Sequence, residues 1–247
     1  MESFRIAAAQ SSSIRGDIEA NVHTHVQFVQ IAVDYSVNVI VFPELSLTGY
    51  EPEIAHDVAI SLEDKCLIPL KEQAKQFGIT IMAGAPINNR HGKPYLGTFV
   101  LGSNESITYI KNYLHPGEEK YFSEGLKKSC IVNVRGEKVG VAICADINHP
   151  SHVEATAKEG ATIYAAGVLM MSGYGEAIEQ LRHYAIKYSM IVAMANYGAM
   201  TGGYVPAGKS AIWDQNGKRM AEAGEKGNAM VIGIRKQNEW TGMTIKI

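Results

Sequence analysis

Short apolar runs alternate with helical patterns along the first part of the chain. Residues 4–9 form an apolar run that predicts a strand. From Asp17 onwards, isoleucine and valine recur at intervals of three and four residues, which predicts an amphipathic helix. Two further runs, 37–42 and 79–83, predict buried strands, with a helix over 62–77 between them. This alternation is typical of an α/β fold.

From residue 88 onwards the pattern adds hairpins to the same alternation. We expect one domain over residues 1–247, with two similar halves and a strand-rich rim, because no linker, low-complexity tract or repeat interrupts the chain. The elements predicted in this part are a hairpin connection at 88–94, strands at 95–101, 107–112, 131–134, 138–144, 161–165 and 190–195, a long loop at 112–125, helices at 151–159 and 176–189, and short strands with glycine turns over 209–235.

Two reactive side chains stand at the ends of predicted strands. Cys144 closes the apolar run 139–143, and Glu44 follows the strand 37–42 after a single proline. In open α/β sheets, ligands and chemistry gather at the carboxyl ends of the strands. A helix that starts after Cys144 would favour a thiolate and an oxyanion through its amides and its dipole. Taken singly, Cys144 also reads as a small buried hydrophobe and Glu44 as a turn-capping carboxylate.

The composition of the chain indicates which classes of partner and which cellular compartment to expect. The 23 Lys and Arg nearly balance the 25 Asp and Glu, and no basic run carries interleaved aromatics, so we expect no nucleic-acid partner. The first residues lack a secretory pattern and no apolar run reaches the length of a membrane span, so we expect no membrane association. The three cysteines, Cys66, Cys130 and Cys144, form neither a disulfide framework nor a zinc motif, which fits a cytoplasmic protein.

Three stretches, taken in order, resemble the motifs of a known family. They are 42–50, 109–111 and 143–146, which contain a glutamate, a lysine and a cysteine. Together they closely resemble the Glu, Lys and Cys motifs of the carbon–nitrogen hydrolase (nitrilase) superfamily. The resemblance covers nearly the whole chain, including 16–21 and 206–210. It implies a four-layer α-β-β-α sandwich and a Glu-Lys-Cys triad. It also implies pairing into dimers through a helical face, so we expect a homodimer or a higher homo-oligomer that acts on a small-molecule amide.

The resemblance assigns roles to individual residues. It implies that Cys144 is the nucleophile, that Glu44 is the general base and that Lys111 stabilises the tetrahedral intermediate. Such roles make chemical sense, because an amide carbonyl is a poor electrophile and an attacking thiol needs a base at hand. The family also has a second glutamate beyond the lysine. For this position we prefer Glu119, with Glu118 as the alternative.

The residues that bind substrate are less sharply defined. The backbone N–H of Ala145 is a candidate donor to the oxyanion. Family members often continue after the cysteine with Tyr-Asp and then Arg-Phe-Pro-Glu, whereas this chain has Ala145 next to the cysteine and Asn148 and His149 further on. Because those positions lie near the acyl pocket in the family, Asn148 and His149 are candidate specificity residues, although His149 also reads as a loop histidine. Tyr50, which ends the glutamate motif, is a further candidate.

We expect a hydrolase that cleaves a small carboxamide or ω-amide through a cysteine thioester and releases ammonia, without a cofactor. Cleavage of an N-carbamoyl group and N-acyl transfer run on the same triad and stay open as alternatives. A metal site made of Cys144, His149 and His152 lacks a fourth ligand nearby, so we expect no metal. A binding protein that kept the fold and lost turnover is disfavoured, because Glu44, Lys111 and Cys144 are all present.

Overall fold

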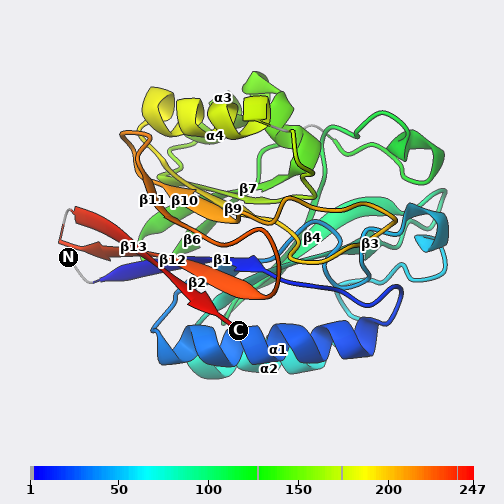
Figure 1. The fold of residues 1–247 in the computed structure, drawn as a ribbon. Coiled ribbons are helices and arrows are strands. Elements are labelled where there is room, and N and C mark those ends of the chain that lie inside the picture. Colours follow the sequence, from blue (N-terminus) through cyan, green and yellow to red (C-terminus); the bar gives the residue numbers. More distant parts are fainter. Residues whose placement is uncertain (1–2, 127, 174, 238) are drawn as a thin grey trace.

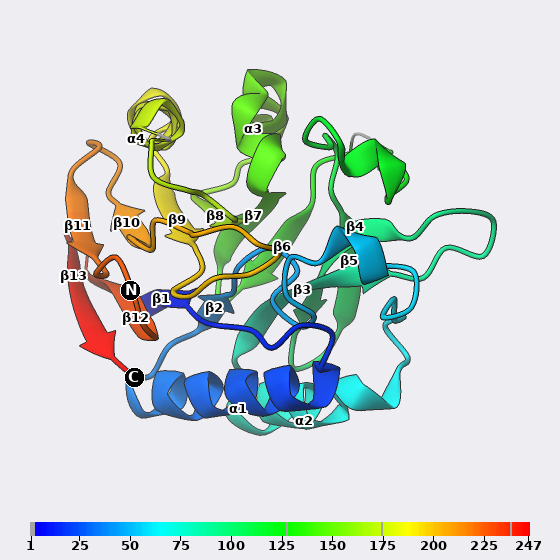
Figure 2. The ribbon, with the colours of Figure 1, turned by 45° about the vertical axis from the view of Figure 1, so that its right-hand side comes forward.

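Four layers stack upon one another in the computed structural model, which describes residues 3–126, 128–173, 175–237 and 239–247 (Figure 1). Two β-sheets pack face to face in the middle, and two helices cover each outer face, as the turned view in Figure 2 also shows. The predicted four-layer α-β-β-α sandwich is therefore confirmed. The helices are α1 (Ile18–Asp34) and α2 (Ile68–Phe77) on one side, and α3 (Pro150–Lys158) and α4 (Gly175–Tyr188) on the other.

Each sheet has three parallel strands at its centre and antiparallel strands at its edges. The first sheet runs in the order β13-β12-β1-β2-β3-β4-β5, and the second in the order β11-β10-β9-β8-β7-β6. The parallel strands are β1, β2 and β3 in the first sheet and β7, β8 and β9 in the second. The strands are β1 (Phe4–Gln10), β2 (Val39–Val41), β3 (Thr80–Ile87), β4 (Tyr95–Leu101), β5 (Ser106–Ile110), β6 (Ile131–Val134), β7 (Glu137–Ile143), β8 (Ile163–Gly167), β9 (Ile191–Ala195), β10 (Ala211–Trp213), β11 (Arg219–Glu222), β12 (Ala229–Lys236) and β13 (Glu239–Lys246).

Three hydrophobic clusters fill the spaces between the four layers. The cluster between the sheets includes Val41 of β2 and Val141 of β7. A second cluster joins the first sheet to α1 and α2, and a third joins the second sheet to α3 and α4. The parallel strands are buried on both faces, which is why they read in the sequence as continuous apolar runs rather than as alternating patterns.

Helix α1 begins where the sequence predicts and carries a buried histidine toward the site. The Asp17 side chain accepts a hydrogen bond from the Ala20 N–H at 3.0 Å, which caps the first turn. About two helical turns beyond Asp17, His25 is fully buried, and its two ring nitrogens lie 2.7 Å from the Asn21 carbonyl oxygen and 2.9 Å from Ser46 Oγ. His25 is thus a hydrogen-bonded core residue that contacts the turn after β2.

Two helix starts and one strand differ from the sequence predictions, each for a physical reason. Helix α2 begins at Ile68 rather than near residue 62, because Pro69 fits a first helical turn and not a helix interior. Helix α3 begins at Pro150, one residue before the predicted start, because proline fits the first position of a helix. Strand β13 was not predicted, although it pairs with β12 along its whole length. Its residues are largely exposed on an edge strand, so no apolar run marks it in the sequence.

The turn after β2 is held between both sheets by two glycines. A Cβ atom added to Gly84 of β3 would lie 2.4 Å from the Leu45 backbone nitrogen. A Cβ atom added to Gly167 at the end of β8 would lie 2.4 Å from the Phe42 carbonyl oxygen. Both strands therefore approach this turn as closely as main chain allows. Leu45 itself adopts a left-handed conformation with φ of 54°. These contacts fix the main chain around Glu44.

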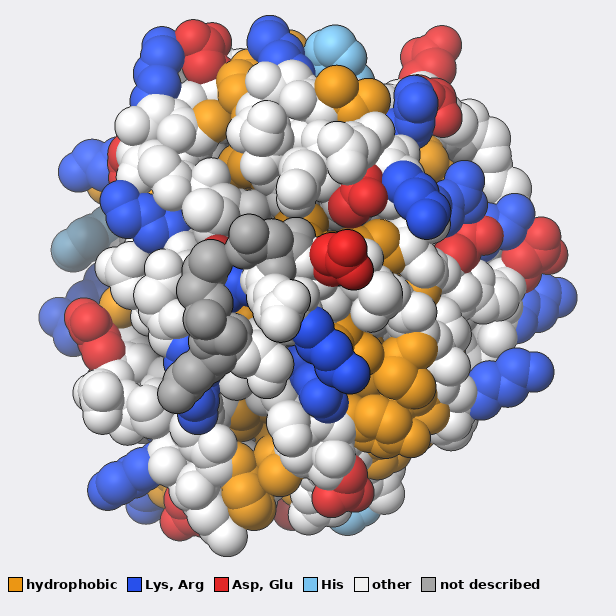
Figure 3. All heavy atoms as spheres, turned by 90° about the vertical axis from the view of Figure 1, so that its left-hand side faces the viewer, with side chains coloured by type: hydrophobic (Ala, Val, Ile, Leu, Met, Phe, Trp, Pro, Cys, Tyr) orange, Lys and Arg blue, Asp and Glu red, His pale blue; other side chains and the backbone are white. Residues whose placement is uncertain are grey.

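The face shown in Figure 3 is the left-hand side of Figure 1. Basic and acidic side chains are interspersed over this face, next to a group of hydrophobic side chains. This mixture of signs agrees with the near balance of charges in the sequence.

Candidate active site

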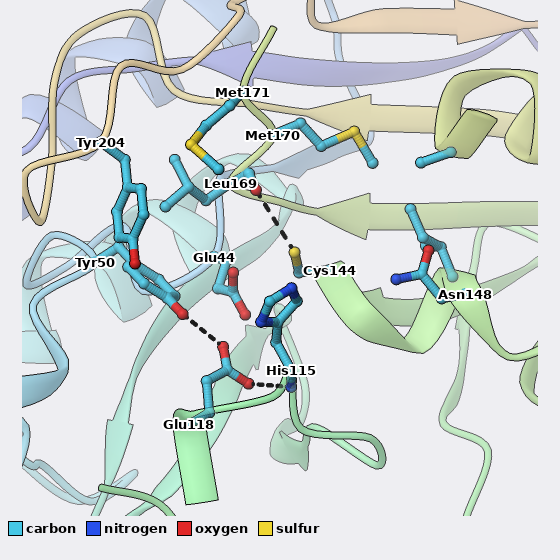
Figure 4. Close-up of a pocket in the computed structure, with 12 residues that line it drawn as sticks. Glu44, Tyr50, His115, Glu118, Cys144, Asn148, Leu169, Met170, Met171 and Tyr204 are labelled. Atoms are coloured by element: carbon cyan, nitrogen blue, oxygen red, sulfur yellow. Dashed lines mark hydrogen bonds between the residues drawn. The ribbon is translucent and has the colours of Figure 1, made fainter. Parts of the chain in front are cut away.

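The ends of three strands meet around one small cavity. Glu44 follows β2, Lys111 follows β5 and Cys144 follows β7, so the residues come from both sheets. The cavity has a volume of about 70 Å³. Figure 4 shows the side chains around it. The described residues that line it are Glu44, Tyr50, His115, Glu118, Cys144, Ile147, Asn148, Leu169, Met170, Met171, Ala177 and Tyr204.

Lys111 lies buried behind the cavity, between two carboxylates. Its Nζ lies 2.6 Å from Glu44 Oε1, and 2.9 and 2.7 Å from the two carboxylate oxygens of Glu118. Burial alone would lower the pKa of Lys111, but the neighbouring Glu44, Cys144 and Glu118 outweigh it and raise that pKa above its ordinary value. The ammonium group is therefore permanently charged at neutral pH.

The structure places Glu118, and not the preferred Glu119, next to Lys111. Glu118 is buried and also accepts hydrogen bonds from the Tyr50 hydroxyl at 2.9 Å and from the His115 N–H at 2.7 Å. Glu119 is exposed, and its carboxylate accepts from the N–H of Gly117. The preference for Glu119 is thus corrected. The cause is local, because the 3₁₀-helix Glu118–Lys120 turns its first side chain inward and the next one outward.

Cys144 has a strained backbone and a protonated thiol. It directly follows β7 and adopts a φ of 39°, which is rare for a residue with a side chain. Its Sγ lies 3.7 Å from the Leu169 carbonyl oxygen. Burial and the adjacent Glu44 raise the pKa of the thiol well above its ordinary value, and Lys111 only partly offsets them. The expectation that a helix start would favour the thiolate therefore does not hold in the resting site.

The two carboxylate oxygens of Glu44 differ in their hydrogen bonding. Its Oε1 accepts from Lys111, whereas Oε2 is buried and has no hydrogen-bond partner among the described residues. Burial raises the pKa of Glu44 to about 7, against the opposing effect of Lys111. The Tyr197 hydroxyl donates to the Glu44 carbonyl oxygen at 2.7 Å, which fixes the backbone of the turn. A buried acceptor without a partner suits a group that receives a proton during reaction.

Asp146 joins the turn after Cys144 to the chain after Lys111. Its carboxylate is fully buried and accepts four hydrogen bonds. The donors are the Tyr109 hydroxyl at 2.7 Å and the N–H groups of Asn112, Tyr113 and Ile143, each at 3.0 Å. Since these donors come from the two sheets, Asp146 sets the position of the lysine segment relative to the cysteine turn.

The four predicted substrate-binding residues fall into two groups. Tyr50 and Asn148 line the cavity. Ala145 is buried directly after Cys144, at the start of the 3₁₀-helix Cys144–Asn148, where N–H groups lack partners within the helix. His149 is not among the described lining residues, and its ring stacks on Tyr113 with a centroid distance of 3.7 Å.

Cys144, His149 and His152, which the sequence analysis considered as metal ligands and disfavoured, are not arranged around one point. The ring of His152 is buried and lies 2.8 Å from the Tyr109 hydroxyl and 2.9 Å from the Tyr164 hydroxyl. Among the residues described, no group of three or more His, Cys, Asp and Glu side chains is arranged to hold a metal ion. His152 is therefore a hydrogen-bonded residue behind Asp146 rather than a ligand beside Cys144.

The sequence matches a known protein family over nearly its whole length. A model of the carbon–nitrogen hydrolase family matches residues 5–242. The chain belongs to the carbon–nitrogen hydrolase family. The resemblance inferred from the three motifs is thereby confirmed.

Curated relatives of the family include synthetases and amidases. The chain is 29% identical over 233 residues to a glutamine-dependent NAD(+) synthetase of Thermotoga maritima, and this match covers 88% of the chain but 39% of the synthetase. It is 28% identical over 227 residues to an (R)-stereoselective amidase of a Pseudomonas species, with 90% of the chain and 81% of the amidase covered. The chain thus spans less than half the length of the synthetases that it matches.

Solved structures show the same fold. An amidase of the nitrilase superfamily from Nesterenkonia AN1 superposes with a TM-score of 0.85 at 22% identity, covering 93% of this chain and 90% of the other. Another structure of that amidase shows Michael addition of acrylamide at its active-site cysteine. Among the described helices of the present chain, none combines the length and apolarity needed to cross a bilayer.

Several residues that line the cavity were not predicted from the sequence. Leu169, Met170 and Met171 lie two to four residues beyond the end of β8 at Gly167, whereas the predicted strand ended at residue 165. His115 and Tyr204 lie in segments without a regular pattern, and nothing in the sequence marks them as lining residues.

Replacing Asp146 by asparagine is expected to lower the free energy of unfolding by about 3 kcal/mol, because a buried carboxylate with several donors would give way to an amide whose own N–H groups face them. Urea unfolding followed by circular dichroism measures the change. The matched control is Asp57→Asn, whose carboxylate is largely exposed and should cost little. Equal unfolding midpoints for the two variants would contradict the positioning role of Asp146.

Proposed function

We propose that this protein is an amidase that hydrolyses a small carboxamide or ω-amide through a cysteine thioester and releases ammonia. The observation behind the proposal is the unpartnered oxygen of Glu44 in the cavity that Cys144 also lines. The protonated thiol of Cys144 provides the proton, and the carboxylate of Glu44, whose pKa lies near 7, provides the acceptor. Lys111 supplies the positive charge that an oxyanion requires.

In the first half-reaction, the Glu44 carboxylate takes the thiol proton while Sγ of Cys144 attacks the amide carbon. The tetrahedral oxyanion is stabilised by the Lys111 ammonium group and by the N–H of Ala145 at the start of the 3₁₀-helix. Protonated Glu44 then gives its proton to the leaving nitrogen. The carbon–nitrogen bond breaks, ammonia departs, and a thioester remains on Cys144.

In the second half-reaction, water takes the place of ammonia. Glu44 accepts a proton from this water, and the resulting oxygen nucleophile attacks the thioester carbon. The carbon–sulfur bond then breaks, the carboxylic acid is released, and the sulfur recovers its proton from Glu44. One carboxylate thus serves both halves, which a pKa near the working pH favours.

Glu118 is proposed to hold Lys111 and Tyr50 in position rather than to exchange protons with substrate. Replacing it by glutamine is expected to lower kcat/KM for the best amide by about 100-fold, because the lysine loses one of its two charged partners. Glu119→Gln is the matched control and should retain wild-type activity, since that carboxylate is exposed. Steady-state assays of ammonia release compare the two. Equal losses would contradict the distinction between these neighbouring glutamates.

A substrate panel tests the proposed function. Purified protein is assayed for ammonia release from simple carboxamides, ω-amides, N-carbamoyl compounds and nitriles, with Cys144→Ala as the blank. Turnover of carboxamides or ω-amides supports the proposal. Turnover confined to N-carbamoyl compounds, or acyl transfer to an added amine without net hydrolysis, would replace it by one of the alternatives on the same triad. The homodimer and the cytoplasmic location remain predictions from the sequence, which sedimentation and fractionation test.

A further inference from the structure

The cavity has a hydrophobic side and an acidic side. Figure 4 shows Leu169, Met170 and Met171 on one side of the Cys144 sulfur, and Glu44 and Glu118 on the other. The three apolar residues follow β8 as one continuous segment. The reacting amide must reach Cys144 and Glu44, so the acyl chain is directed toward the hydrophobic side. The aromatic rings of Tyr50 and Tyr204, which meet edge to face with centroids 5.9 Å apart, close this part of the cavity.

The charges around the cavity are unfavourable to an anion. Among the described lining residues, none is lysine or arginine, and the imidazole of His115 faces the carboxylates of Glu44 and Glu118. Behind these carboxylates, the ammonium group of Lys111 already contacts both. A carboxylate on the acyl chain would lose its water without gaining a positive partner, and it would lie in the same small space as negative side chains.

From this arrangement we infer that the substrate carries a short, neutral, apolar acyl group, and that ω-amides bearing a carboxylate, glutamine among them, are poor substrates. The inference rests on the proposed amidase function and narrows it. The small size of the cavity, about 70 Å³, favours a short acyl chain over a long one. It also separates this chain from its relatives that are named glutamine-dependent NAD(+) synthetases.

Two amides of equal length provide the decisive comparison. Butyramide ends in a methyl group, and the half-amide of succinic acid ends in a carboxylate at the same position. We expect kcat/KM for butyramide to exceed that for the succinic half-amide, and that for glutamine, by roughly 100-fold or more, because both of these chains carry a carboxylate that no lysine or arginine among the described lining residues compensates. Equal or better turnover of the succinic half-amide or of glutamine would overturn the inference while leaving the amidase function intact. Ammonia release from no carboxamide or ω-amide at all would overturn the proposed function and the inference together.

A charge-supplying variant tests the cause of this selectivity. Asn148 is exposed at the edge of the cavity, so Asn148→Arg places a guanidinium group there, and Asn148→Gln is the uncharged control. The ratio of kcat/KM for the succinic half-amide to that for butyramide should rise at least about tenfold in Asn148→Arg relative to Asn148→Gln. Because the readout is a ratio, a general loss of activity does not affect it. An unchanged ratio would overturn charge as the origin of the selectivity.

Discussion

Cys144→Ala is expected to lower kcat/KM for the best amide by at least about 10⁴-fold, because no other described residue that lines the cavity carries a thiol to form the thioester. Folding should be retained, since alanine replaces a small, partly accessible side chain. A thermal melt alongside the ammonia assay verifies that the loss is chemical. A melting temperature near that of the wild type together with absent turnover is the expected pair of results.

The thioester itself is the more direct observation. Brief exposure to a slow amide or analogue, followed by peptide mass mapping, should place an acyl adduct on Cys144 alone. Cys66 and Cys130 serve as internal controls, because neither is among the described residues that line the cavity beside Glu44. Burial raises the pKa of each of these two thiols to about 11. An adduct on Cys130 in active enzyme, or full turnover by Cys144→Ala, would remove the covalent mechanism.

Glu44→Gln is expected to lower kcat/KM by about 10³-fold or more, because glutamine keeps the shape of the side chain but cannot accept a proton. Both formation and hydrolysis of the acyl adduct should slow, since one carboxylate is proposed to activate both thiol and water. Rapid-quench mass spectrometry separates the two steps. A variant that forms the adduct at the wild-type rate and fails only to hydrolyse it would assign thiol activation to another group.

The pH dependence follows from the same carboxylate. The pKa of Glu44 is raised to about 7, so its basic form is present above pH 7 and is lost as the pH falls through that value. The kcat/KM of the wild type should therefore decline tenfold per pH unit on the acid side of pH 7. This limb should be absent from the residual activity of Glu44→Gln. Glu119→Gln, with its exposed carboxylate, should keep it.

The positions of Glu44 and Cys144 were predictable because each follows an apolar run that forms a buried strand. Lys111 was assigned through the family resemblance, since the predicted strand 107–112 extends past it, whereas β5 ends at Ile110. The choice between Glu118 and Glu119 was not predictable in this way. Both belong to a loop without a regular period, and their directions depend on a single 3₁₀ turn after Gly117, which has a φ of 100°.

Properties that depend on packing between distant segments could not be predicted from the local sequence either. The four donors to Asp146 come from positions separated from it by up to 37 residues, and no local pattern reveals them. The protonated state of Cys144 has a similar origin. Its immediate sequence indicates a helix start that favours a thiolate, whereas burial and a glutamate 100 positions away in the chain decide the opposite.

The two glycines that clamp the turn after β2 have a mechanical consequence. Gly167 lies on β8, which is paired with β7, the strand that carries Cys144. The main chain around Glu44 thus contacts the strand next to β7, which Cys144 directly follows. The spacing between Glu44 and Cys144 is therefore set largely by backbone contacts. The same packing that joins the two sheets holds these two side chains near each other.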